Sequence, residues 1–99
     1  MNPNKVSRNN LSSLTDLPNI GKAGEGDLIV LGINKPADLI GFCPYEMHKS
    51  LCEKTGIQHD VCVIDVFISI TRFMQGEEPK PWWEYTSERK QYLQSSERT

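Results

Sequence analysis

The sequence predicts an all-α fold made of about five short helices. Three observations support this fold class. Apolar residues recur three or four positions apart along much of the chain, as they do on one face of a helix. No stretch of useful length alternates apolar and polar residues, so no sheet is expected. Glycine and proline stand where such helices would end or begin, and 99 residues suffice for one domain with a single core.

The N-terminal part is expected to hold an arm, a short helix, a turn and a second helix. Residues 1–10 are polar and rich in asparagine, which is typical of a flexible arm. Ser12 or Ser13 can cap a short helix that must end before Pro18. The next expected elements are a turn at 17–21, a helix over 22–31 and a C-terminal stop at Gly32.

The second half predicts three more helices, each preceded by a residue suited to a helix start and followed by glycine. Their expected ranges are 35–40, 45–54 and 61–75. Residues 76–81 break the chain, and Trp82, Trp83 and Tyr85 return it to the body. We therefore divide the chain into a flexible arm (1–10), a helical domain (11–85) and a charged C-terminal tail (86–99).

The helix expected over 61–75 is apolar on most of its circumference, which is typical of a helix at the centre of a core. A chain of this size cannot easily cover such a helix on every side. Its surplus apolar surface could be covered by the C-terminal aromatics or by a second copy of the chain. We expect Trp82 and Trp83 to pack on this helix, with base stacking by one of them as the alternative.

The stretch around the first turn resembles a helix-hairpin-helix motif. That motif has a hydrophobic-Pro-Gly-hydrophobic-Gly hairpin between two helices, and here it reads Leu17-Pro18-Asn19-Ile20-Gly21. Together with the segment at 56–67 and the late Pro81-Trp82-Trp83, it makes residues 11–85 similar to the bacterial pathogenicity-locus family of small helix-hairpin-helix proteins. The first half is also similar to the C-terminal helical domains of the competence regulator TfoX and of the RNA polymerase alpha subunit. The resemblance implies a helix-hairpin-helix unit packed on a second helical hairpin.

The same resemblance implies a nucleic-acid site at Asn19, Ile20, Gly21 and Lys22. A tight turn that feeds a helix exposes backbone N–H groups with no carbonyl partner, and these groups form a local anion site. Gly21 is the second hairpin glycine, and Lys22 could pair with a phosphate. Asn19 replaces the first glycine, and asparagine tolerates a left-handed backbone. The expected function is a non-enzymatic, nucleic-acid-associated binding module in which Lys5 and Arg8 of the arm help the hairpin. DNA, bound without sequence specificity, is one partner that this function allows.

The charge of the chain favours a second interpretation. The net charge is −2, and residues 11–41 hold two lysines against four acidic residues, whereas duplex binders usually gather cations. The hairpin could therefore serve only to join two helices. The chain would then be a protein-interaction or dimerisation domain that associates through helix 61–75.

The cysteines and histidines suggest a further, weaker alternative. His48 and Cys52 lie four apart, and His59 and Cys62 three apart, so helix geometry could bring them together for zinc. No Cys-x-x-Cys pair occurs, and the thiols can equally fill a core. We expect no metal, no cofactor and no catalytic residue. The odd number of cysteines and the polar N-terminus predict a cytoplasmic protein that does not enter a membrane.

Overall fold

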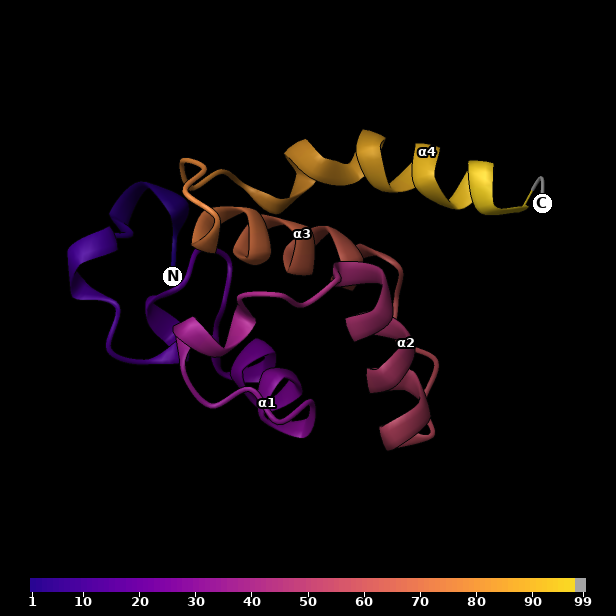
Figure 1. Cartoon of the computed structure of the whole chain (residues 1–99), viewed down its shortest axis with the longest axis horizontal. Helices are drawn as coiled ribbons and strands as arrows, with labels where there is room; N and C mark the ends of the chain where they lie inside the picture. Colours follow the sequence, from indigo (N-terminus) through magenta and orange to yellow (C-terminus); the bar gives the residue numbers. More distant parts are fainter. Residues whose placement is uncertain (98–99) are drawn as a thin grey trace.

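The computed structural model describes residues 1–97, and these residues form four α-helices joined by short turns (Figure 1). No strand occurs in this range, which confirms the all-α class. The helices are α1 (Lys22–Val30), α2 (Pro44–Thr55), α3 (Cys62–Met74) and α4 (Thr86–Glu97). Short 3₁₀ helices lie at Pro3–Lys5, Arg8–Asn10, Leu14–Asp16, Pro36–Leu39 and Trp82–Tyr85. None of the helices in the described range combines the length and apolar character needed to cross a membrane.

Helix α3 lies at the centre, with α4 along one side and α1 and α2 on the other (Figure 1). One face of α3 buries Phe67, Ile70 and Phe73 in the larger core cluster. The other face buries Ile64 and Ile68 in a smaller cluster with Tyr85. Tyr85, one of the C-terminal aromatics, thus covers this face, which is one of the two covers expected for helix 61–75. Association of two copies through this helix stays a prediction.

Three of the five predicted helices are confirmed as α1, α2 and α3, with ends within about two residues of those expected. The other two are only 3₁₀ turns, at Leu14–Asp16 and Pro36–Leu39. In each turn an aspartate folds back on the chain: Asp16 accepts the N–H groups of Ser12 and Ser13, and Asp38 those of Asn34 and Lys35. A left-handed residue follows three positions later, so neither turn continues as an α-helix.

The turn before α1 and the turn before α2 are built alike. A buried leucine follows each aspartate, Leu17 in the first turn and Leu39 in the second. The left-handed position is Asn19 in the first, with φ of 66°, and Gly41 in the second, with φ of 95°. The chain thus uses one turn design twice, and the first copy lies at the turn expected over 17–21.

The N-terminal segment lies on the body, although we expected a flexible arm. The Arg8 guanidinium donates to the carbonyl of Phe73 over 2.6 Å and to that of Glu77 over 2.8 Å. Its central carbon also lies 4.1 Å above the Phe73 ring, in a cation–π contact. These contacts fasten residues 1–10 to the C-terminal end of α3.

The expected tail folds as α4 over Thr86–Glu97, and the last two residues of the predicted tail lie outside the described range. A buried ion pair holds this helix on α3: Arg89 Nε donates to Asp65 Oδ1 over 2.9 Å. Tyr92 stacks on Tyr45 of α2, with ring centroids 3.6 Å apart. The boundaries between arm, domain and tail stay a prediction, but both flanking segments contact the central helices.

Candidate nucleic-acid interface

The four predicted site residues lie together in the hairpin turn, but they differ in exposure and in their hydrogen bonds. Ile20 is a core residue with 1% of its surface exposed, so only its backbone can face a ligand. Asn19 is already engaged: its N–H donates to the Met1 carbonyl over 2.7 Å, and its amide donates to Ser69 Oγ and the Lys80 carbonyl. Gly21 and Lys22 remain open at the surface.

The first turn of α1 supplies the free donors. In the part of the chain that the structure describes, the N–H groups of Gly21, Lys22, Ala23 and Gly24 donate to no protein atom. Such groups carry the positive end of the helix dipole and favour an anion. A Cβ placed on Gly21 would meet nothing within 4 Å, so the backbone there is open to a close approach. The local geometry therefore suits a phosphate at Gly21 and Lys22.

A cleft of about 700 Å³ opens beside this turn. Its walls come from the hairpin, the N-terminal segment and the segment before α4. The lining residues are Met1, Asn2, Pro3, Asn4, Thr15, Asn19, Ile20, Gly21, Pro81, Trp82 and Trp83. Sequence reasoning did not find this cleft, because its walls are far apart along the chain.

The two indoles lie at the cleft, although we expected them to cover helix 61–75. Trp83 leaves 62% of its surface exposed, so the packing prediction is wrong for this residue. Tyr85 takes the expected role, since it is 4% exposed and packs on Ile64 and Ile68. Trp82 is half-buried and meets Trp83 edge to face, with ring centroids 5.7 Å apart and planes at 82°.

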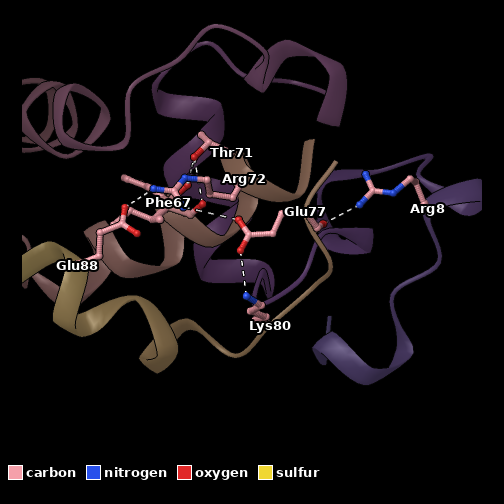
Figure 2. A network of polar contacts seen from close by, with 8 residues as sticks. Arg8, Phe67, Thr71, Arg72, Glu77, Lys80 and Glu88 are labelled. Atoms are coloured by element: carbon pink, nitrogen blue, oxygen red, sulfur yellow. Dashed lines mark hydrogen bonds and ion pairs between the residues drawn. The ribbon is translucent and has the colours of Figure 1, made fainter. Parts of the chain in front are cut away.

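A network of charged side chains holds the segment that carries the indoles (Figure 2). Glu77 pairs with Lys80 over 3.1 Å and with Arg72 of α3 over 3.7 Å. Arg72 also pairs with Glu88 of α4. Each exposed pair contributes little alone, but the network ties residues 77–80 to two helices. The bond from the Asn19 amide to the Lys80 carbonyl, 2.9 Å long, fixes the same segment to the hairpin.

The family model described as Pathogenicity locus matches residues 7–91. The chain belongs to this family. The chain is also similar to the Mitomycin resistance protein McrB of Streptomyces lavendulae, with 33% identity over 82 residues that cover 83% of this chain and 78% of the relative. No solved structure matches the chain. The further likeness to the TfoX and RNA polymerase domains stays a prediction, as does the complete helix-hairpin-helix arrangement.

The region matched by the Pathogenicity locus family also contains the cysteines and histidines. His48 Nε2 lies 3.0 Å from the His59 carbonyl, and the His59 N–H donates to Cys52 Sγ over 3.3 Å. His59 Nε2 lies 2.9 Å from Thr55 Oγ1. Within residues 1–97, no three acidic, histidine or cysteine side chains come together in a way that could hold a metal. These contacts instead fasten the loop at 56–60 to α2.

Cys62 does not join this group and has a different neighbour. The Asp60 carboxylate accepts a hydrogen bond from the Cys62 side chain, which raises the pKa of the thiol above its usual value. A nucleophilic cysteine needs the opposite shift, toward the thiolate. Asp60 also accepts the Cys62 N–H over 2.9 Å and so begins α3. The contacts of Cys62 thus serve the start of a helix.

Proposed function

We propose that the chain is a non-enzymatic nucleic-acid-binding module of the cytoplasm, and that it holds a phosphate at the hairpin. The observation that carries this proposal is the open row of N–H groups at Gly21, Lys22 and Ala23, beside a cleft with an exposed indole. Backbone donors read no base edges, so binding is expected to be independent of sequence.

The charge of the chain sets the expected strength. A chain with a net charge of −2 gains little from long-range attraction to a polyanion. Lys22 is exposed at the first position of α1, where its ammonium group adds a positive charge beside the positive end of the helix dipole. We expect a dissociation constant of about 10⁻⁴–10⁻⁶ M for duplex DNA at physiological salt, as for other non-specific binders.

The test is fluorescence anisotropy with labelled duplex DNA at about 50 and about 200 mM salt, because phosphate contacts must produce a salt slope. Lys22→Glu should weaken binding and reduce that slope by about one. Gly21→Val should weaken binding by blocking the backbone. It should still fold, since Gly21 has an extended conformation with φ of −104° that other residues adopt.

Lys35→Glu is the matched control, because Lys35 is also exposed and precedes the second copy of the turn. It makes the same change in net charge away from the hairpin. We expect its affinity to remain close to that of the native protein. If Lys22→Glu and Gly21→Val bind as well as Lys35→Glu does, the hairpin does not hold the phosphate.

A second candidate function is protein association through a site other than α3. A small pocket of about 210 Å³ lies between α1 and α2, and Leu31 and Phe42 line it. Phe42 is 41% exposed, and Ile40 nearby in the chain is 66% exposed, which favours an apolar contact. Sedimentation velocity at rising concentration would reveal self-association, and Phe42→Ser should abolish it. A monomer at all concentrations removes dimerisation as the function.

The name of the McrB relative supplies a cellular test of the function. We propose that this chain also confers mitomycin resistance, because the two proteins share 33% identity over most of both chains. Expression in a mitomycin-sensitive host should raise survival, and Lys22→Glu should remove the gain if the hairpin site underlies it. Equal survival with and without the native chain would separate its role from that of the relative.

A further inference from the structure

We propose that the cleft between the hairpin and Trp82–Trp83 binds an unpaired nucleotide of a single strand. The base stacks on the exposed face of Trp83, while the adjoining phosphate meets the N–H groups of Gly21 and Lys22. This inference rests on the proposed function, since it names the form of nucleic acid that the same site prefers.

The orientation of the indoles supports a stacking role. Trp82 meets Trp83 edge to face, with the ring planes at 82°, so the two rings restrain each other. Trp83 keeps 62% of its surface exposed, which is unusual for the largest apolar side chain. An exposed indole that a neighbouring ring restrains can stack on a base, whatever the base is.

The lining of the cleft does not repel a negatively charged nucleotide. Among the acidic residues whose side chains the structure describes, none lines the cleft. Asp16 and Glu84 directly follow lining residues but stay out of the lining, and Asp16 turns its carboxylate to Ser12 and Ser13. The polar side chains of the lining are neutral and belong to Asn2, Asn4, Asn19 and Thr15. Neutral amides can bond to base edges without repelling a phosphate.

The size and position of the cleft also favour an unpaired base. A volume of about 700 Å³ falls in the range of small-ligand sites, about 300–1,000 Å³. The bases of a duplex are stacked on each other and cannot present a face to an indole. A base in a single strand is free to do so. Gly21 and Trp83 line the same cleft, so one nucleotide can reach both the hairpin donors and the ring.

The experiment compares three ligands on the full chain: an oligothymidylate of about ten nucleotides, the matching oligouridylate, and a duplex of equal length. We expect the native protein to bind the single strands more tightly than the duplex. Trp83→Ala should weaken single-strand binding by about fivefold to a hundredfold and leave duplex binding unchanged. The DNA and RNA strands distinguish the two sources of an unpaired base.

Tyr92→Ala is the matched control, since Tyr92 is an aromatic residue with 47% exposure that does not line the cleft. It should not change single-strand affinity. Stacking itself is observed in Trp82→Phe, where Trp83 is the one remaining tryptophan of the two in the sequence. Its fluorescence should be quenched by the single strand. Thermal melts of each variant establish that it is folded.

The outcomes separate the inference from the proposed function. Binding of single strands that falls in Trp83→Ala but not in Tyr92→Ala supports the inference. Equal affinity for single strand and duplex, unchanged in Trp83→Ala but lost in Lys22→Glu, overturns the inference and leaves the hairpin function intact. The absence of binding to every nucleic acid at about 50 mM salt overturns both.

Discussion

Removal of Arg89 should be the most damaging single change on α4. Asp65 has 0% of its surface exposed, and Arg89 supplies two of the bonds to its carboxylate, over 2.9 and 3.4 Å. Thr86 Oγ1 supplies the third over 2.7 Å. Arg89→Ala leaves a buried carboxylate with one partner. Because breaking a buried pair costs about 3–5 kcal/mol and one bond survives, we expect a loss of about 3 kcal/mol.

The loss is measured by urea unfolding followed by circular dichroism. For a domain of this size it corresponds to a fall in Tm of about 12–24 °C. The hydrogen bond to Asp65 raises the pKa of Arg89, so the guanidinium stays charged and the loss should be the same across the neutral range. Lys90→Ala, at the exposed next position, is the control and should change stability by less than about 0.5 kcal/mol.

A second variant tests the physical cause. Adding Asp65→Asn to Arg89→Ala removes the unpaired charge and should recover about 1–2 kcal/mol. The reasoning fails if Arg89→Ala costs no more than Lys90→Ala, because Asp65 would then be neither buried nor dependent on α4.

Three further predictions concern the hairpin, the helix glycines and the smaller core. Asn19→Ala forces an alanine to φ of 66° and removes the amide bonds to Ser69 and Lys80, so it should lower the free energy of unfolding in urea by about 2–4 kcal/mol. Asn19→Gly removes only the amide bonds and should lower it by about 1–2 kcal/mol. Equal losses in the two variants would contradict the role of the backbone. Gly26→Ala should stabilise the protein by about 0.5–1 kcal/mol, because the added Cβ would meet nothing within 4 Å. Gly24→Ala should stabilise it less, because its Cβ would lie 3.2 Å from Ile20 Cδ1. The opposite order of Tm in thermal melts would count against this packing. Burial raises the pKa of Tyr85 from 10.0 to about 12, so the unfolded chain ionises first and stability should fall as pH rises from 10 to 12. Tyr85→Phe should lose less stability over this interval in a pH series of urea unfolding. Parallel curves for the two proteins would refute the pKa shift.

The local pattern of the sequence was enough for three helices and for the turn at 17–21, because capping residues, glycine stops and apolar spacing act over a few residues. Helix α4 was missed for the opposite reason. Its range is polar, and its attachment depends on Arg89 meeting Asp65, 24 positions earlier in the chain. Tyr85 was among the aromatics expected to cover α3, but the contribution of α4 through Leu93 was not foreseen.

The two short 3₁₀ turns show a limit of prediction from local sequence. Ser12 or Ser13 was expected to cap a short helix, and Ser13 does precede the element, yet only a 3₁₀ turn forms. Pro18 disfavours helical backbone at Leu17, and Asn19 then takes the left-handed conformation. Which of these local preferences prevails depends on Leu17 and Ile20 entering the core, and that is a property of the whole fold.

Asn19 links the two parts of the site more closely than a glycine could. The helix-hairpin-helix motif that the sequence resembles has glycine at this position, and Asn19 adopts a left-handed backbone at φ of 66°. Its amide then reaches the Lys80 carbonyl, 61 positions along the chain and directly before the Pro81-Trp82-Trp83 segment. A glycine would make the turn but would leave that segment without its tie to the hairpin. Asn19→Gly should therefore keep the backbone donors, and with them duplex binding, while single-strand binding weakens because Trp83 is no longer held beside them. If single-strand affinity is unchanged in Asn19→Gly, the ionic network around Glu77 alone positions the indoles.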